Sequence, residues 1–394
     1  MVVIVSALRS AIGKYGGSLR NTQPEELVSI LMQNNLSSAG IDGSLVDEVM
    51  IGHTKQSAHN PNIARLAALK AKLPENISGH TVHMQCGSGM QAVINGAMSI
   101  MTGQNEVVLA GGVEVMSKAP YYFVGNRFGI RPGELNLSDA NIESQPKSQP
   151  EEIYGDFSMG MTAEWLTEKY NISREEQDEF SLLSQQKALK AIEEKKFIDE
   201  IVPIPVRERK EEYQHFATDE FPRETSIEKL ANLKPVFKND GSVTAGNATG
   251  RNDGASTLLL MSENKAKELN LEPLAYIRSF ASAGVNPKEM GIGPVPATQK
   301  ALDVAGLSFA DLDLIELNEA FAAQSLAVLK EWGSDGANVN VNGGAIALGH
   351  PLGSTGARVL TTLVHEMGKR DNHFGLATMC VAGGQGISMV VERK

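Results

Sequence analysis

Residues 81–112 read TVHMQCGSGMQAVINGAMSIMTGQNEVVLAGG. The apolar run at 81–85 predicts a β-strand, and the small-residue stretch at 89–101 predicts an α-helix. A second apolar run at 107–110 predicts another strand, which leads into a pair of glycines. Strand–helix–strand alternation implies a parallel sheet with helices on both faces. This stretch therefore assigns the chain to the α/β class.

The same alternation continues on both sides of this stretch. Thr22 is the expected N-cap of a helix at 24–34. Residues 119–150 are rich in Asn, Gly, Pro and Ser without a clear period, which predicts an irregular excursion. Further strands are expected at 2–7, 48–52, 256–261, 274–281, 314–317, 339–341, 376–380 and 387–391, and further helices at 161–170, 174–195 and 320–331.

Two regions of the chain show a similar pattern. In each, a strand is followed by a reactive residue, Cys86 or His350, and then by a Gly/Ser-rich helix start. In each, a later strand meets paired glycines, at 111–112 and at 383–384. The similarity is weak at the level of single residues. A duplicated α/β unit and two unrelated α/β segments therefore both stay open at this point.

Composition narrows the class of protein. The length of 394 residues suffices for two or three domains. A net charge of −11 argues against a general nucleic-acid or membrane-surface binder, since both need a positive field. No apolar run reaches the roughly 18 residues of a membrane span. The chain starts in a strand-like run and ends in VERK, without a signal peptide or a peroxisomal signal, so we expect a cytoplasmic protein.

The only cysteines are Cys86 and Cys380, which argues against a disulfide scaffold. Such a cysteine is most often a small buried hydrophobic residue. Each of these two, however, lies in a glycine-rich stretch where a strand is expected to end. A helix N-terminus after Cys86 would lower the pKa of its thiol below the ordinary value of about 8.5. Cys86 is therefore a candidate nucleophile, with a buried structural cysteine as the alternative.

Three other residues are candidates for the same chemistry. His350 lies in a stretch, 342–356, with five glycines in fifteen residues, which is typical of a loop shaped around a ligand. It could activate a thiol or donate a hydrogen bond to a thioester oxygen. Cys380 could transfer a proton, and the amide of Asn318 could hold a water or a carbonyl oxygen.

Competing kinds of site fit the sequence less well. Two cysteines and a histidine could bind zinc, but the chain has no C-x-x-C pair and no fourth ligand at usable spacing. A P-loop, a full G-x-G-x-x-G with its acidic partner and the G-x-S-x-G nucleophile elbow are all missing from the sequence. No metal site is expected.

Taken together these stretches resemble the thiolase family over nearly the whole chain. The resemblance implies a layered αβαβα core of two similar halves, an N-terminal half at 1–118 and 249–272 and a C-terminal half at 273–394, with an inserted CoA-binding loop domain at 119–248. It is carried by VSALRSAIGKYGG (5–17), CGSG (86–89), GNATG (246–250), NEAF (318–321), GHP (349–351) and Cys380.

The resemblance also implies a role for each catalytic residue. Cys86 takes the acyl group as a thioester, and His350 activates its thiol. Cys380 abstracts the α-proton of the second acyl-CoA. His350 and a water held by Asn318 form one oxyanion hole, and the N–H groups of Cys86 and Ala382 form the other. Removing one donor from such a hole typically costs about 10²–10³ in rate.

The expected activity is the condensation of two acetyl-CoA to acetoacetyl-CoA and CoA, and the reverse thiolysis. The alternatives are a degradative 3-ketoacyl-CoA thiolase of broader chain length and a non-catalytic, thiolase-like acyl-CoA-binding protein. A ketoacyl synthase is disfavoured because it typically has a second histidine where Cys380 stands. Acyl-CoA is a substrate, no tightly bound cofactor is expected, and fatty acid metabolism is the expected setting. The residues expected along CoA are Met159, Arg223, Phe237, Ala245, Thr249, Met290, Ala320 and Phe321.

Four positions depart from the commonest family pattern. His83 stands where many members have Asn, and Arg251 occupies a usually apolar position. Ser158 replaces a histidine of short-chain members, which leaves chain-length preference open. Ala382 replaces a usual glycine and would cost about 1 kcal/mol if its φ had to be positive. The stretch 119–150 does not match the expected tetramerisation loop, so a homodimer is as plausible as a homotetramer.

Overall fold

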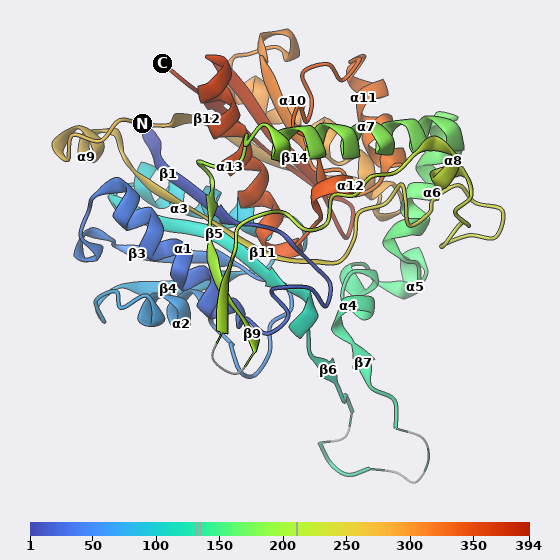
Figure 1. Cartoon of the computed structure of the whole chain (residues 1–394), viewed down its shortest axis with the longest axis horizontal. Helices are drawn as coiled ribbons and strands as arrows, with labels where there is room; N and C mark the ends of the chain where they lie inside the picture. Colours follow the sequence, from blue (N-terminus) through green and yellow to red (C-terminus); the bar gives the residue numbers. More distant parts are fainter. Residues whose placement is uncertain (126, 131–132, 134, 210–211) are drawn as a thin grey trace.

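The computed structural model describes residues 1–125, 127–130, 133, 135–209 and 212–394 (Figure 1). Its main sheet is formed by β1 (Val2–Ser10), β3 (Glu48–Gly52), β4 (Ser78–Val82), β5 (Val107–Val115), β11 (Asn252–Ser262), β12 (Ala275–Gly284), β13 (Leu314–Leu317), β14 (Phe374–Val381) and β15 (Gln385–Glu392). The strand order is β13-β14-β15-β12-β1-β11-β5-β3-β4. The short β2 (Gly13–Lys14) pairs with β11, and the short β8 (Ile201–Val202) pairs with β1.

The sheet consists of two similar parts that meet at β1 and β12. These strands pair at Val3–Tyr276 and Ile4–Ala275. Outward from this junction, one side runs β1, β11, β5, β3 and the other runs β12, β15, β14, β13. Both sides pair antiparallel, antiparallel and then parallel. The matching order and direction confirm the prediction of two similar α/β halves.

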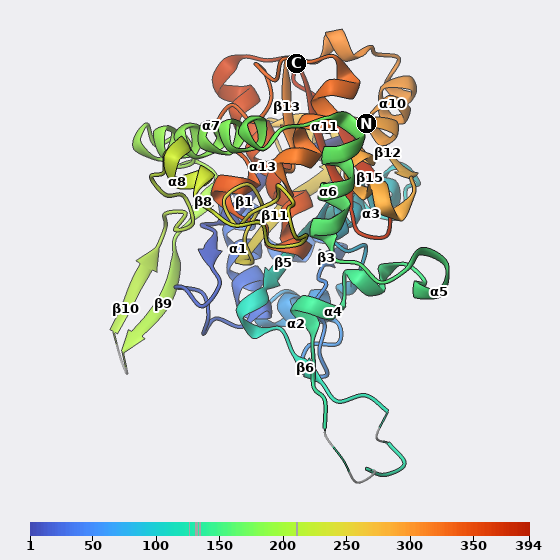
Figure 2. The same ribbon diagram turned by 90° about the vertical axis from the view of Figure 1, so that its right-hand side faces the viewer.

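The helices and the two parts of the sheet form five layers: outer helices, strands, central helices, strands and outer helices. The helices α3 (Ser88–Met101) and α13 (Leu352–Arg370) pack on each other in the middle, and each also contacts strands. The N-terminal half is covered by α1 (Pro24–Ala39) and α2 (Ile63–Lys70), and the C-terminal half by α10 (Pro294–Ala305) and α11 (Ala322–Trp332). Figure 2 shows this arrangement from the side. The largest apolar cluster joins α3, α13 and strands of both halves, so the shared core lies at the centre.

Several predicted boundaries were wrong, for identifiable reasons. The strand expected at 339–341 is reduced to one bridge between Ile315 and Val339, because Asn340 turns the chain with φ 47°. The N-cap of α1 is Gln23 rather than Thr22, and it forms no side-chain cap bond. β4 ends at Val82, earlier than predicted.

The glycines at 111–112 lie inside β5 rather than at its end, which also corrects the prediction. A Cβ atom added at Gly112 would lie 1.9 Å from the carbonyl oxygen of Gly353. The missing side chain therefore lets α13 lie directly against β5. By contrast, Gly383 and Gly384 have φ of 88° and 79° and form the turn between β14 and β15.

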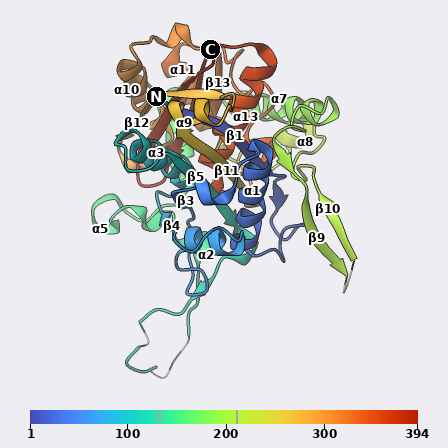
Figure 3. The same cartoon turned by 90° about the vertical axis from the view of Figure 1, so that its left-hand side faces the viewer.

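The insertion lies beside the two halves. Its β6 (Tyr121–Tyr122) and β7 (Ser138–Asp139) begin an arm that projects from the body (Figure 1), of which positions 126, 131, 132 and 134 lie outside the described residues. The hairpin of β9 (Ile204–Arg209) and β10 (Glu212–Phe216) projects separately (Figure 3). The α-helices of the insertion are α4 (Ala140–Glu143), α5 (Glu151–Tyr154), α6 (Met159–Tyr170), α7 (Arg174–Glu193) and α8 (Ile227–Ala231). Two further α-helices of the described residues are α9 (Glu263–Glu268) and α12 (Ala345–Leu348).

A buried ion-pair cluster ties the insertion to β1. The guanidinium of Arg9 lies 2.5 Å from Glu200 and 2.7 Å from Asp219. All three side chains are almost fully buried, so each charge depends on the others for compensation. The predicted domain boundaries at 118, 248 and 272 stay a prediction. Within the described part of the chain, no helix is long and apolar enough to span a membrane.

Candidate active site

A cavity of about 350 Å³ is lined by three of the four candidate catalytic residues, Cys86, His350 and Cys380. Cys86 enters it from the turn before α3, His350 from the turn before α13, and Cys380 from the end of β14. Cys86 and His350 thus occupy equivalent positions in the two halves, each just before a central helix. Residues predicted along the substrate also line this cavity: Met159, Phe237, Thr249, Met290, Ala320 and Phe321.

Cys86 is held in a turn beside two N–H donors. Gln85 precedes it with φ 44°, and α3 begins two residues later at Ser88. The main-chain N–H groups of Ala382 and of Cys86 itself lie beside the thiol and favour its thiolate form. Burial nevertheless raises the pKa of the Cys86 thiol to about 11, with these N–H groups opposing the rise. The predicted fall of this pKa was therefore wrong, because loss of hydration outweighs the two N–H groups and the nearby charge of Lys55.

His350 is oriented to act as a base. Its Nδ1 lies 2.6 Å from Oγ1 of Thr355, and that hydroxyl donates to the carbonyl of Pro351 at 2.9 Å. Because the Thr355 hydroxyl gives its proton to the carbonyl of Pro351, it can only accept a hydrogen bond from the imidazole. Nδ1 therefore carries the ring proton, and Nε2 carries none. Nε2 is buried and has no hydrogen-bond partner among the described residues. Burial, together with the charge of Arg358, lowers the pKa of His350 to about 3, so the ring is neutral.

Cys380 is 1% exposed, at the penultimate position of β14. Burial raises the pKa of its thiol well above the ordinary value, and the nearby charge of Cys86 adds to the rise. The φ of Ala382, two residues on, is not positive, whereas Gly383 and Gly384 directly after it do have positive φ. The strain considered for an alanine at this position therefore does not arise.

Asn318 follows β13 and is completely buried. Neither Oδ1 nor Nδ2 of its amide has a hydrogen-bond partner among the described residues. Such an unsatisfied buried amide is costly, and a bound water would satisfy it. Asn318 is not itself in the cavity lining, although Ala320 and Phe321 are.

The remaining predicted CoA residues are less closely grouped. Arg223 and Ala245 are exposed and lie outside the cavity lining. The guanidinium of Arg223 lies 5.1 Å from the ring centre of Phe221, and that ring packs at Gly250, which does line the cavity. Among the departures from the family pattern, Ser158 and Arg251 line the cavity and His83 does not.

Sequence reasoning missed three residues that support the site. Thr355 orients His350 from the first turn of α13. Glu114 is fully buried in β5 and accepts a hydrogen bond from the N–H of Gly353 at 3.0 Å. A carboxylate within the apolar run VVLAGGVEV (107–115) was the available signal, because a buried charge requires partners. The third is Lys55, buried near Cys86.

The arrangement suits covalent acyl transfer. A thiol lies with a neutral imidazole and two N–H donors, which are the parts needed to form and stabilise a tetrahedral intermediate. A second thiol in the same cavity can exchange a proton with a carbon atom of the substrate.

Comparison with known proteins gives consistent matches over the full length. A family model for the thiolase N-terminal domain matches residues 2–264, and one for the thiolase C-terminal domain matches residues 271–393. The chain is 53% identical over 393 residues to an acetyl-CoA acetyltransferase of Pseudomonas aeruginosa, covering 100% of this chain and 99% of that protein. The crystal structure of the Bacillus anthracis acetyl-CoA acetyltransferase superposes with a TM-score of 0.96 at 49% identity, over 99% of this chain and 98% of that one. The human mitochondrial 3-ketoacyl-CoA thiolase gives 0.95 at 41% identity, over 100% of this chain and 98% of that one.

Proposed function

The chain belongs to the thiolase family, and from this we propose that it is an acetyl-CoA C-acetyltransferase, which condenses two acetyl-CoA to acetoacetyl-CoA and CoA and catalyses the reverse thiolysis. The observation that carries the proposal is the meeting of Cys86, a neutral His350 and Cys380 in one cavity. The name of the relative from Pseudomonas aeruginosa supports acetyl-CoA as the substrate.

In the cleavage direction, the first half-reaction breaks the carbon–carbon bond. Nε2 of His350 takes the proton of the Cys86 thiol, and the thiolate attacks the ketone carbon of acetoacetyl-CoA. The N–H groups of Cys86 and Ala382 stabilise the resulting oxyanion. The bond between the ketone carbon and the α-carbon then breaks, leaving an acetyl group on Cys86 and an enolate of acetyl-CoA. Protonated His350 and a water on Asn318 stabilise that enolate, and the Cys380 thiol protonates its carbon.

The second half-reaction removes the acetyl group from Cys86. The incoming CoA thiol gives its proton to the Cys380 thiolate, and the CoA thiolate attacks the thioester carbonyl. Acetyl-CoA leaves, and the Cys86 thiolate recovers its proton from His350. Condensation is the same sequence in reverse, so Cys380 then abstracts the α-proton. Since one product leaves before the second substrate enters, ping-pong kinetics are expected.

Chain-length preference is tested by CoA-dependent cleavage of acetoacetyl-, 3-ketohexanoyl- and 3-ketodecanoyl-CoA. We expect kcat/KM to be highest for acetoacetyl-CoA, by about tenfold or more, because each added methylene must find room in a cavity already walled by Met159, Phe237 and Met290. Comparable or faster cleavage of the longer esters would assign the enzyme to the degradative class. Binding of acyl-CoA without cleavage of any ester would favour a binding protein.

We also propose a homo-oligomer. The arm that begins with β6 and β7 exposes Tyr121, Tyr122, Phe128 and Leu135, and Phe128 is 100% exposed. Such an apolar surface on a projecting arm is typical of a protein–protein contact. Sedimentation velocity is expected to show a dimer or tetramer, and Phe128→Ser with Leu135→Ser is expected to weaken its assembly. A monomer at micromolar concentration of the unmodified chain would contradict this.

We further propose that the protein acts in fatty acid metabolism and in the cytoplasm. The support is the acyl-CoA chemistry of the family. Cell fractionation followed by the cleavage assay checks the location, and activity confined to the membrane fraction would contradict it.

A further inference from the structure

A buried lysine lies behind one wall of the catalytic cavity. Lys55, in the loop after β3, is 3% exposed. Its Nζ donates to the carbonyl of Ala140 at 2.8 Å, to the side-chain oxygen of Gln145 at 3.4 Å, and to the hydroxyl of Ser144. All three acceptors are uncharged and lie in or directly after α4. Burial lowers the pKa of Lys55. A long, flexible side chain is therefore held, at a cost in hydration and entropy, against one short segment.

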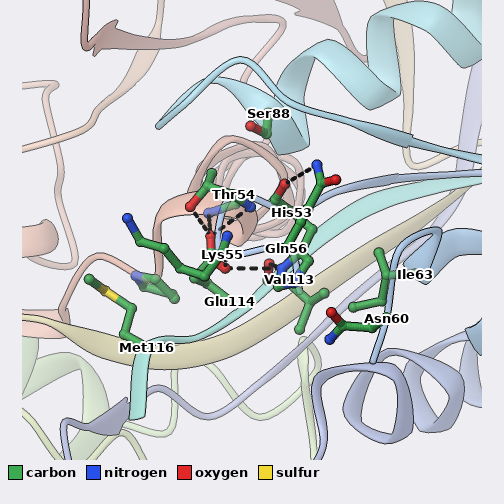
Figure 4. A network of polar contacts seen from close by, with 12 residues as sticks. His53, Thr54, Lys55, Gln56, Asn60, Ile63, Ser88, Val113, Glu114 and Met116 are labelled. Carbon is green, nitrogen blue, oxygen red and sulfur yellow. Dashed lines mark hydrogen bonds and ion pairs between the residues drawn. The ribbon is translucent and has the colours of Figure 1, made fainter. Parts of the chain in front are cut away.

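The base of this lysine is fixed by Glu114. The carboxylate accepts from the main-chain N–H groups of Thr54 and Lys55 at 3.0 Å each and from the Thr54 hydroxyl at 2.5 Å. His53 forms an ion pair with it at 3.0 Å, and Figure 4 shows these groups gathered around the carboxylate. Burial opposes the charge, but His53, Thr54 and Lys55 together lower the pKa of Glu114 to about 2. The loop that carries Lys55 is thus anchored to β5.

The segment that Lys55 holds forms part of the cavity wall. Asn141, Ile142, Gln145 and Pro146 line the same cavity as Cys86, His350 and Cys380. α4 packs mainly on its own neighbours, β7 and the turn at 146–148, rather than on the main sheet. The wall therefore depends on individual polar bonds to stay in place.

Hydrogen bonds from Gln85 also connect the same segment to the nucleophile. The amide of Gln85, directly before Cys86, donates to the carbonyl of Ser144 at 3.1 Å and to the hydroxyl of Ser148 at 2.8 Å. Ser144 is therefore contacted from two sides, by Lys55 through its hydroxyl and by Gln85 through its carbonyl. Loss of the lysine would leave the segment attached through Gln85 and through Asn141, whose amide donates to the carbonyl of Met116 at 2.9 Å, but would remove the bonds to Ala140, Ser144 and Gln145.

We propose that Lys55 is a positioning residue. Its hydrogen bonds to Ala140, Ser144 and Gln145 form a latch that holds the segment 140–146 over Cys86, and this latch sets the affinity and acyl-chain selectivity of the cavity. Lys55 does not line the cavity, so it acts through the wall rather than on the reacting atoms. The selectivity part of this role rests on the proposed thiolase activity, whereas the latch itself can be observed without turnover.

The test compares Lys55→Met, which keeps the apolar stem and removes the ammonium group, with Lys55→Arg, which keeps a cationic donor. Lys70→Met is the matched control, because Lys70 is 43% exposed on α2 and pairs only loosely with Glu25 at 3.8 Å. Hydrogen–deuterium exchange of peptides covering 139–148 reports on the latch. Steady-state cleavage of acetoacetyl- and 3-ketohexanoyl-CoA reports on the cavity.

In Lys55→Met we expect exchange at 139–148 to rise about tenfold or more while exchange in α3 stays unchanged, since charge-assisted hydrogen bonds are lost. We expect KM for acetoacetyl-CoA to rise about tenfold with kcat changed less than about threefold, and the preference over 3-ketohexanoyl-CoA to shrink. Lys55→Arg should recover a large part of each change, and Lys70→Met should show none.

Unchanged exchange and unchanged KM in Lys55→Met would overturn the proposal, as would a loss confined to kcat. If Lys55→Met does not fold, Ser144→Ala removes one acceptor of the latch and should show the same changes more weakly; wild-type values in that variant would also overturn it. Failure of the unmodified enzyme to cleave acetoacetyl-CoA would instead contradict the proposed function. Hydrogen–deuterium exchange at 139–148 would still show whether Lys55 holds this segment in place.

Discussion

Replacing Cys86 with alanine is expected to abolish acyl-enzyme formation and to lower kcat/KM for acetoacetyl-CoA cleavage by about 10⁴-fold or more. The variant keeps the N–H groups and His350 but has no atom that can accept the acetyl group. The thiol is only 8% exposed and the turn around it is held by main-chain bonds, so alanine should preserve the fold.

Intact-protein mass spectrometry after incubation with acetyl-CoA measures this directly. The unmodified enzyme should gain one acetyl group, and the variant should gain none. Iodoacetamide should label Cys86 selectively in the unmodified enzyme, and acetyl-CoA should slow that labelling; equal inertness of both cysteines would favour a binding protein. Acetylation of the variant at another residue would refute Cys86 as the nucleophile.

Replacing Cys380 with alanine is expected to separate the two half-reactions. Acetylation of Cys86 by acetyl-CoA should continue, because the departing CoA thiolate is a stable anion that can take a proton from solvent. Condensation should fall by about 10²–10⁴, since the weakly acidic α-proton then has no base positioned to remove it. The side chain is 1% exposed, so its loss should also cost some stability, and melting temperature must be measured alongside.

Mass spectrometry of the acetyl-enzyme and a spectrophotometric condensation assay together check this separation. Cys380→Ser serves as the matched control of similar size, with a weaker acid in place of the thiol. Condensation at the unmodified rate in Cys380→Ala would refute the assignment. Loss of acetylation as well would show that acetyl transfer between CoA and Cys86 also requires the proton exchange with Cys380.

Local patterns predicted much of the fold and the identity of the reactive residues. The strands at 48–52 and 314–317 matched, because short apolar runs between breakers leave little choice of register. Cys86 and His350 were identified from the glycines around them, since glycine-rich turns before helices are local features. At 339–341, however, Asn340 lies between two apolar residues. Its side-chain amide donates hydrogen bonds to the carbonyl of Leu317 and to the carboxylate of Glu319, and the chain turns here instead of extending.

The electrostatics of the site could not be predicted in this way. The pKa of Cys86 depends on how completely β14, α13 and the insertion exclude water, and those elements lie far from it in the sequence. The tautomer of His350 depends on Thr355, five residues further on and across a helix start. The contacts of Lys55 with Glu114 and with Ala140 depend on how β3, β5 and α4 pack together in the fold. Long-range packing decides each of these, and a single sequence carries little direct signal of it.

The central position of α13 has a consequence for synthesis on the ribosome. This helix packs on α3, β5 and β11, yet it is made from residues 352–370, near the end of the chain. β1 likewise pairs with β11, so Val2 finds its partner only when Ser262 has been made. Pairings this distant slow folding, and the nascent N-terminal half exposes apolar surface until its partners emerge. Chaperone demand during translation should therefore persist until β11 and finally α13 have been made, although the first half carries the nucleophile.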